Sequence, residues 1–411
     1  MPEKFYYQCI NCGKEYPANG VRYLCEECEK SNSSDLPPKG VLKTLYFYER
    51  INQNNVKDTF QKLKENLFLD LLPVSNKKYL PKLQVGNTPL YQINELDKKH
   101  LNFDLFLKDD SQNPTYSYKD RASYIVSAYA KENNIDTLIT ASTGNAGSSL
   151  AGICASQNQK AIILVPEKAP LAKLTQILMY GAQLVPVKGT YDDAFDLSVE
   201  ASRKFGWYNR NTAFNPFTIE GKKTVAFELF EQLNYQIPDT VFVPVGDGVI
   251  ISGVYKGFED LLKLNITNQM PKIIAVQSAQ SDNLVRNIDN EQFEIKTSNT
   301  LADSISVDIP RNFYMAKKYL KKYSGAYFSV ADDEILKAST LLSKNTGLFS
   351  ELAAATAFAG FLHYQASGKL KAKSKNVVLL TGSGLKDLQA VQSVINMPQA
   401  IEPETFFLQI E

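Results

Sequence analysis

From about residue 80 onward, short runs of β-branched and aliphatic residues alternate with longer stretches that have helical periodicity. The runs lie at residues 136–141, 160–165, 183–187, 240–246, 272–277 and 376–381. Strands that alternate with helices in this way are typical of βαβ units and a mostly parallel sheet. In such folds, ligands collect at the carboxyl ends of the strands. We therefore expect an α/β protein with its functional site at those ends.

Composition and charge narrow the class of protein further. The 411 residues are 44% hydrophobic and 22% charged, which is ordinary for a globular protein of two or three domains. The formal net charge is +1, so no overall field favours nucleic acid or an acidic membrane. The N-terminus lacks a basic-then-apolar signal region, and no apolar run approaches the roughly 20 residues of a membrane span. These features predict a cytoplasmic protein that binds neither nucleic acid nor membrane.

The turn after the expected strand at 240–246 has the composition of an anion site. Gly246 and Gly248 allow backbone N–H groups to approach a ligand, and a helix beginning near Val249 adds its positive end. A turn of this kind typically binds a phosphate group. Because residue 251 is isoleucine, the spacing is not that of a dinucleotide-binding glycine motif. A tight strand-to-helix turn without a ligand is the alternative.

Two other expected strand ends carry polar side chains. Ser142, Thr143 and Gly144 offer hydroxyls and N–H groups that suit a carboxylate, and Asn145 can donate to an oxygen anion. Thr381 can donate a hydrogen bond to an unprotonated ring nitrogen. Helix capping is the alternative role for these residues. Three polar turns at strand ends together suggest one ligand that is held from several sides.

Lys119 lies where a helix is expected to begin. Asn113 and Pro114 form a turn, and Ser117 is a plausible N-cap, so Lys119 falls in the first helical turn. The positive end of the helix dipole disfavours an ammonium there, and burial would disfavour it further. Both effects favour the free amine, which attacks carbonyls. An amine, a phosphate turn, a carboxylate turn and a ring-nitrogen donor together describe a pyridoxal phosphate Schiff base that holds an amino acid.

The chain resembles threonine synthases and their relatives among the fold type II pyridoxal phosphate enzymes, over about residues 80 to 390. Six motifs carry the resemblance: "VGNTPL" (85–90), "KDDSQNPTYSYKDRAS" (108–123), "ASTGNAG" (141–147), "YNRNTAFNPFTIEGKKT" (208–224), "VPVGDGVIISGVYKGF" (243–258) and "TGSGLKD" (381–387). The resemblance implies a tryptophan synthase β-like fold of two α/β domains with mostly parallel sheets. The large cofactor domain would comprise residues 80–124 and 216–411, and a small mobile substrate domain would comprise residues 125–215.

The resemblance also implies roles for individual residues. Lys119 would be the Schiff-base lysine and the proton carrier, Asn145 would contact the ring hydroxyl, and Thr381 the ring nitrogen. Glu351, in "ELAAAT", would lie near the ring. The residues implied to bind the cofactor phosphate are Gly246, Asp247, Gly248, Val249 and Ile250. Those implied to bind the substrate carboxylate are Ser142, Thr143 and Gly144. The implied reaction converts O-phosphohomoserine and water to threonine and phosphate.

Two departures bear on the substrate. Tyr116 occupies a position that is usually glycine in the lysine motif. Thr218 stands where many threonine synthases carry an arginine that is available for the substrate phosphate. A dianionic phosphate needs a nearby cation. The cations in the same segment are Arg210, Lys222 and Lys223, of which we expect Arg210 and Lys222 to bind the substrate.

The first 32 residues form a separate cysteine-bearing module, followed by a linker and helix over residues 33–79. Its four thiols, Cys9, Cys12, Cys25 and Cys28, have the spacing C-x2-C-x12-C-x2-C. Four thiolates can close a tetrahedral zinc site, and in a reducing compartment metal is favoured over disulfides. The module is therefore expected to be a zinc ribbon with a structural Zn²⁺, with unligated cysteines as the alternative.

Several alternatives stay open at the level of sequence. An ammonia-lyase that acts on threonine or diamino acids, and a β-replacement synthase of the cysteine or cysteate type, share the expected fold. A catalytically silent relative whose ribbon binds a partner is a third alternative. The chain has only two histidines, so a histidine-based triad or metal enzyme is poorly supplied. The expected partner is a small amino-acid substrate, and the family suggests a monomer or a homodimer.

Overall fold

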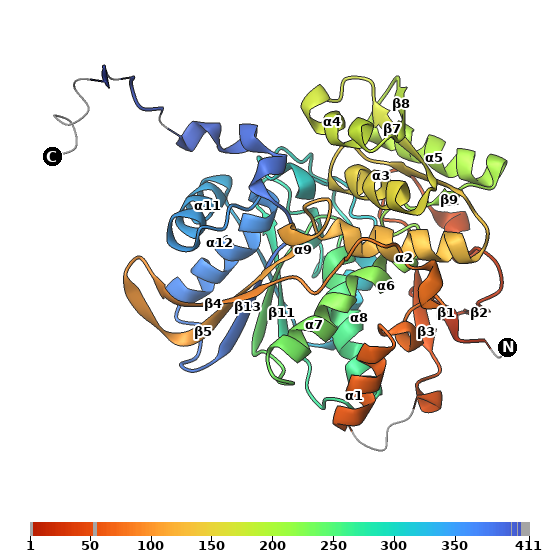
Figure 1. Cartoon of the computed structure of the whole chain (residues 1–411), viewed down its shortest axis with the longest axis horizontal. Coiled ribbons are helices and arrows are strands. Elements are labelled where there is room, and N and C mark those ends of the chain that lie inside the picture. Colours follow the sequence, from red (N-terminus) through yellow and green to blue (C-terminus); the bar gives the residue numbers. More distant parts are fainter. Residues whose placement is uncertain (1–2, 52–55, 396, 401, 404–411) are drawn as a thin grey trace.

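The computed structural model describes residues 3–51, 56–395, 397–400 and 402–403. The largest of its three sheets has six strands (Figure 1). In spatial order they are β12 (Ala326–Val330), β11 (Lys272–Ser278), β10 (Thr240–Pro244), β13 (Lys375–Leu380), β5 (Lys99–Asp109) and β4 (Leu90–Leu96). All neighbours are parallel except β4, which is an antiparallel edge strand. The expected mostly parallel sheet is confirmed.

Helices cover both faces of this sheet, because its central strands are apolar on both sides. Val241 and Val243 of β10 pack in the cluster that contains α8 (Val249–Lys263), whereas Phe242 packs in the cluster that contains α12 (Leu352–Ala366). Further helices flank these two: α6 (Phe217–Lys222), α7 (Thr224–Gln232), α9 (Asn283–Arg286), α10 (Phe313–Lys322) and α11 (Asp332–Thr346). The carboxyl end of β10 leads directly into α8, which places the amino end of that helix at the edge where a ligand is expected.

A second sheet is fully parallel and has four strands. Their spatial order is β8 (Gln183–Val187), β7 (Lys160–Pro166), β6 (Thr137–Ala141) and β9 (Tyr208–Asn209). Its helices are α2 (Lys119–Glu132), α3 (Asn145–Gln157), α4 (Leu171–Met179) and α5 (Tyr191–Phe205). The sheet falls within the segment 125–215 expected to form the small domain. The exact boundaries and the mobility of that domain stay predictions.

The N-terminal module is a small antiparallel sheet of order β2-β1-β3, made of β1 (Phe5–Cys9), β2 (Glu15–Pro17) and β3 (Leu42–Tyr46). β3 lies in the segment 33–79 that we expected to be a linker and helix, so that expectation is partly wrong. Buried side chains of β1 and β3 pack in the same core cluster, so the core of the module extends beyond its first 32 residues. A helix was expected over residues 55–72, and α1 (Val56–Glu65) forms its first part, whereas residue 55 lies outside the described residues.

The six strands expected from the sequence correspond to β6, β7, β8, β10, β11 and β13. The strands β4, β5 and β12 were not expected. β4 and β5 mix charged and apolar residues, whereas β12 (AYFSV) is short and contains a serine. In the part of the chain that the structure describes, no helix is both long and apolar enough to cross a membrane.

The helices α2 and α6 cross at a very short distance, and Gly221 makes that crossing possible. A Cβ atom on Gly221 would lie 1.9 Å from the carbonyl oxygen of Arg121 and 2.6 Å from its carbonyl carbon. Backbone atoms cannot move away as the end of a side chain can. The crossing fixes the relative positions of Lys119, which begins α2, and Lys222, which ends α6.

Gly221→Ala is therefore expected to lower the free energy of unfolding by about 3 kcal/mol or more, through overpacking against backbone. Chemical denaturation followed by circular dichroism measures the change. Gly181→Ala is the matched control, because Gly181 has φ +75° but open space around its Cβ position. It should cost only about 1 kcal/mol through its left-handed backbone. Equal costs at the two positions would contradict the close crossing.

Candidate functional site

Lys119 is the first residue of α2, and the loop that precedes it is fastened to the end of β13. The backbone N–H of Tyr118 donates to the carbonyl of Thr381 at 2.9 Å, and Ser117 forms a β-bridge with Gly382. The expected N-cap at Ser117 is wrong by one position, because Tyr118 occupies the cap and makes no side-chain capping bond. The bridge holds Ser117 in extended pairing, and this displaces the start of the helix by one residue.

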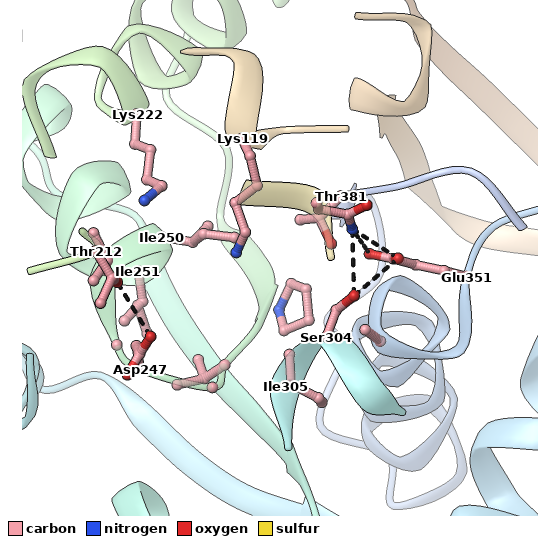
Figure 2. Close-up of a pocket in the computed structure, with 17 residues that line it drawn as sticks. Lys119, Thr212, Lys222, Asp247, Ile250, Ile251, Ser304, Ile305, Glu351 and Thr381 are labelled. Carbon is pink, nitrogen blue, oxygen red and sulfur yellow. Dashed lines mark hydrogen bonds between the residues drawn. The ribbon is translucent and has the colours of Figure 1, made fainter. Parts of the chain in front are cut away.

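The half-buried side chain of Lys119 lines a cavity at the carboxyl edge of the large sheet (Figure 2). Its amine makes no hydrogen bond or ion pair with any described residue. Burial lowers the pKa of Lys119 below its ordinary value, and the nearby Arg210 lowers it further. Asp247 and Glu351 act in the opposite direction but do not outweigh burial. The environment therefore favours the neutral, nucleophilic amine.

The turn between β10 and α8 forms one wall of the cavity. Gly248 has φ +84°, a conformation that favours glycine, and α8 begins at the next residue, Val249. A Cβ atom on Gly246 would lie 3.0 Å from the Cα of Ile305, so this turn passes close to the opposite wall. The first N–H groups of α8 have no partner within the helix, and the helix dipole adds positive potential. This end of the cavity is built for an anion.

Asp247 lies in the same turn, where its carboxylate fixes neighbouring loops. One oxygen accepts from the hydroxyl of Thr212 at 3.1 Å, and the other accepts from the backbone N–H of Arg311 at 3.0 Å. The carboxylate thus has two donors of its own while it lines the cavity. Its hydrogen bonds join the segment that precedes α6 to the loop that precedes α10.

The opposite end of the cavity carries a carboxylate held by an amide. The amide nitrogen of Asn145 lies 3.1 and 2.9 Å from the two oxygens of Glu351, and the hydroxyl of Ser304 donates to Glu351 at 3.1 Å. Figure 2 shows Glu351 and Ser304 on the side of the cavity that Thr381 occupies. Burial raises the pKa of Glu351, although Asn145 and Lys119 oppose the shift. Glu351 is thus a titratable group close to the amine.

The structure brings most of the expected site residues into this one cavity. Its lining consists of Lys119, Asn145, Thr212, Lys222, residues 244–251, Ser304, Ile305, Glu351, Ala353 and Thr381. Thr143 and Gly144 line an adjoining cleft that shares Asn145, Ser304 and Glu351 with the cavity. The exposed ring of Tyr116 also lines this cleft.

Two expected substrate-binding residues lie outside the cavity and the cleft. The N–H of Ser142 pairs with the carbonyl of Leu164 at 3.1 Å, and the side chain of Ser142 accepts from Gly144. The guanidinium of Arg210 donates to the hydroxyl of Ser123 at 3.1 Å and to the carbonyl of Lys119 at 3.5 Å. Arg210 therefore contacts the α2 backbone behind the amine of Lys119. Its positive charge lowers the pKa of Lys119, although its side chain does not line the cavity.

Sequence reasoning missed Thr212, Ser304, Ile305 and Ala353. Thr212 lies inside a motif that we recognised, so its place in that motif could have indicated it. Ser304 and Ile305 come from a segment without regular periodicity, and nothing in their spacing marks them. Lys386, in the "TGSGLKD" motif, also reaches the cleft, where it donates to the hydroxyl of Ser148 at 2.8 Å.

The four N-terminal thiols form a separate cluster. Their sulfur atoms all lie within 4.8 Å of one another, with Cys9–Cys28 and Cys12–Cys25 separations of 3.7 Å. A tetrahedral zinc site with bonds of about 2.3 Å has sulfur–sulfur edges of roughly 3.8 Å, so the spacing fits this geometry. Burial raises the pKa of Cys25, but hydrogen bonds from Tyr16 and from backbone N–H groups outweigh it and lower that pKa to about 6. The cluster can hold a metal ion.

Comparison with known proteins gives consistent matches. The family model "Pyridoxal-phosphate dependent enzyme" matches residues 81–382. A threonine synthase of Methanocaldococcus jannaschii is 34% identical over 96% of both chains. One from Halalkalibacterium halodurans is 35% identical over 82% of this chain and 93% of its own.

The solved structures that match have lower sequence identity. A threonine deaminase from Solanum lycopersicum has a TM-score of 0.66 at 22% identity, over 84% of this chain and 91% of its own. A serine racemase from Dictyostelium discoideum has a TM-score of 0.62 at 24% identity, over 81% of this chain and 99% of its own. At these identities the likeness concerns the fold, which is the expected fold type II architecture.

Proposed function

The chain belongs to the threonine synthase family of pyridoxal-phosphate-dependent enzymes, and from this premise we propose that it converts O-phosphohomoserine and water to L-threonine and phosphate. The observation that carries the proposal is the similarity to threonine synthases along nearly the whole chain. The cavity supports it with an amine whose pKa is lowered by burial, a helix end that suits an anion and an amide–carboxylate pair.

The residues of the cavity fit pyridoxal phosphate. Lys119 presents an unpartnered amine that would bond to the aldehyde, and the amino end of α8 would hold the phosphate. We assign the ring hydroxyl to Asn145 and the ring nitrogen to Thr381. When bound, the cofactor takes up the electron pair that is released when the substrate loses its Cα proton.

The residues of the chain would bind the substrate and move its protons. Thr143 and Gly144 line the cleft beside the cavity and would bind the substrate carboxylate. Lys119 would accept the proton from Cα when its amine is neutral, the form that its lowered pKa favours. A proton then leaves Cβ and phosphate leaves from Cγ. Addition of a proton at Cγ, addition of the hydroxyl of water at Cβ and return of a proton to Cα complete the exchange. The same amine can carry these protons because burial keeps its pKa low. Glu351 lies close enough to influence the charge of the amine.

We also propose a structural Zn²⁺ on Cys9, Cys12, Cys25 and Cys28. Four protein thiolates leave no open coordination position, which argues against a catalytic metal. Such a site requires reduced thiols, and it therefore supports a cytoplasmic location. A homodimer and the absence of nucleic-acid and membrane partners stay predictions.

Incubation of the purified protein with O-phosphohomoserine tests the reaction. Threonine and inorganic phosphate are expected in equal amounts, measured by chromatography and a phosphate assay. An ammonia-lyase would instead release 2-oxobutyrate from threonine and leave phosphohomoserine intact. A β-replacement synthase would need an added nucleophile such as sulfide. Either result would exclude the proposed reaction. Absence of all three activities in cofactor-loaded protein would indicate a silent relative.

A further inference from the structure

The segment 208–224 contains three cations, and the structure gives them three different environments. The ammonium of Lys223 is paired with Glu220 and, at 2.7 Å, with Asp260. Arg210 is turned toward Ser123, behind the amine of the site. Of these three, only Lys222 lines the cavity.

Lys222 is held rigidly at the wall of the cavity. Its side chain is 2% exposed and belongs to the last residue of α6. A Cβ atom on Gly253 would lie 2.7 Å from the Cβ of Lys222, so α8 approaches α6 closely at this point. Because Gly253 lies one turn into α8, the lysine is placed next to the amino end of that helix. Figure 2 shows the amines of Lys222 and Lys119 both directed toward the cavity.

No carboxylate among the described residues forms a direct ion pair with Lys222, although the charge of Asp247 is near enough to raise its pKa. Its amine makes no hydrogen bond or ion pair with any described residue. Burial lowers its pKa well below the ordinary value, and the neighbouring charges of Lys119 and Arg210 lower it further. Asp247 is the acid that raises it, but the carboxylate of Asp247 already accepts hydrogen bonds from Thr212 and Arg311. A buried, unpaired ammonium is unfavourable unless an anion joins it.

We propose that Lys222 is the cation that binds a phosphate monoester in this cavity and makes ligand selection depend on the phosphate group. The inference rests on the proposed function, which brings two such groups to the cavity, one on the cofactor and one on the substrate. The unpartnered amine and the adjacent end of α8 provide a charged donor and backbone donors for one dianion. Thr212, whose hydroxyl faces the same space, is a further neighbour.

The test compares wild-type holoenzyme with Lys222→Gln, which keeps most of the side-chain length but removes the charge. Release of pyridoxal phosphate on dilution, followed by absorbance near ~410 nm, reports the cofactor's phosphate. The KM for O-phosphohomoserine, together with inhibition by inorganic phosphate, reports the substrate's phosphate. Loss of the positive charge should weaken binding of the phosphate group that Lys222 contacts, either that of the cofactor or that of the substrate, by about 100-fold.

The experiment has two arms: cofactor release, and the substrate KM together with phosphate inhibition. They distinguish the phosphate of the cofactor from that of the substrate. A raised KM and weaker phosphate inhibition with unchanged cofactor release would assign Lys222 to the substrate. Faster cofactor release with an unchanged KM in saturating cofactor would assign it to the cofactor. Lys222→Arg should recover part of the lost affinity, which a purely structural role would not predict. If Lys222→Gln folds and changes neither arm by more than about 3-fold, the proposal is overturned.

The control and the readouts keep this result separate from the proposed reaction. Lys337→Gln removes one positive charge from α11, where Lys337 is exposed and paired with Asp333, and it should change neither arm. If the wild type makes no threonine, the proposed reaction fails. The cofactor arm can still be measured in that case, as can the binding of inorganic phosphate to the holoenzyme by calorimetry. If wild type and Lys222→Gln then release the cofactor at the same rate and bind inorganic phosphate equally well, the proposed role of Lys222 is overturned.

Discussion

Lys119→Ala is expected to abolish threonine formation, with kcat reduced by about 10³-fold or more, because in the proposed reaction one amine both joins the cofactor and moves the substrate protons. The same change should remove the absorbance band near ~410 nm that a lysine-bound pyridoxal phosphate gives. The protein should still fold, since the amine of Lys119 makes no hydrogen bond or ion pair with the described residues. A folded variant that keeps the band would show that another group holds the cofactor.

A matched control lies on the same helix. Lys131 is in the last turn of α2 and donates to the carbonyl of Gln157 at 3.0 Å, far along the helix from the cavity. Lys131→Ala should keep both the absorbance band and the activity. Loss of both in this control would indicate that the helix, rather than the amine, is what the substitution at Lys119 disturbs.

The reaction of the amine with the cofactor should have an unusual pH dependence. A surface lysine, with a pKa near 10.5, is mostly protonated and slow to attack an aldehyde at neutral pH. Because burial and Arg210 lower the pKa of Lys119, a larger fraction is neutral, and its rate should fall only as the pH drops through that lowered value. The rate at which apoprotein recovers the absorbance band, measured across pH, checks this. A rate that rises continuously toward pH 10.5 would contradict it.

Site residues that belong to short, local sequence patterns could be predicted from the sequence. The turn at 246–250 and Thr381 follow expected strand ends, and Lys119 follows a turn at an expected helix start; all three line one cavity. The turns are close in space because parallel strands end at one edge of a sheet. The pairing of Asn145 with Glu351, 206 positions apart, could not be derived from any local pattern. The resemblance gave the position of Glu351 but not its partner.

Choosing among cations also required the structure. Lys222 and Lys223 are adjacent, yet one faces the cavity and the other is buried between Glu220 and Asp260. Neighbours on a helix point about 100° apart, and only the packing of α6 against α8 decides which one faces the ligand. Arg210 was expected in the site for its charge alone, and its bond to Ser123 shows why charge is insufficient.

The N-terminal module was recognisable as a cysteine cluster, but its attachment to the rest of the chain was not. β3 pairs with β1 so that Leu42 lies opposite Cys9, and the same strand ends at Tyr46. The hydroxyl of Tyr46 donates to Glu220 of α6 at 2.7 Å. Lys43 of β3 pairs with Glu259 of α8. The cysteine module is thereby joined, through buried polar contacts, to the two helices that flank Lys222.

The double substitution Cys25→Ser and Cys28→Ser is expected to remove bound zinc and lower the free energy of unfolding by at least about 3 kcal/mol, because metal binding stabilises only the folded module. Elemental analysis should find about one zinc ion per wild-type chain and almost none in the variant. Since β3 contacts both α6 and α8, the variant should also release pyridoxal phosphate faster than the wild type.

Cys154→Ala is the control for the loss of a cysteine, because this thiol is buried in α3, away from the cluster. It should keep the zinc content of the wild type while it costs some core packing energy. If wild-type protein produced with ample zinc contains no metal, the zinc site is wrong. If zinc is lost and the cofactor is retained as tightly as before, the polar contacts of β3 with α6 and α8 do not transmit the state of the module to the cavity. The metal would then stabilise the N-terminal sheet alone.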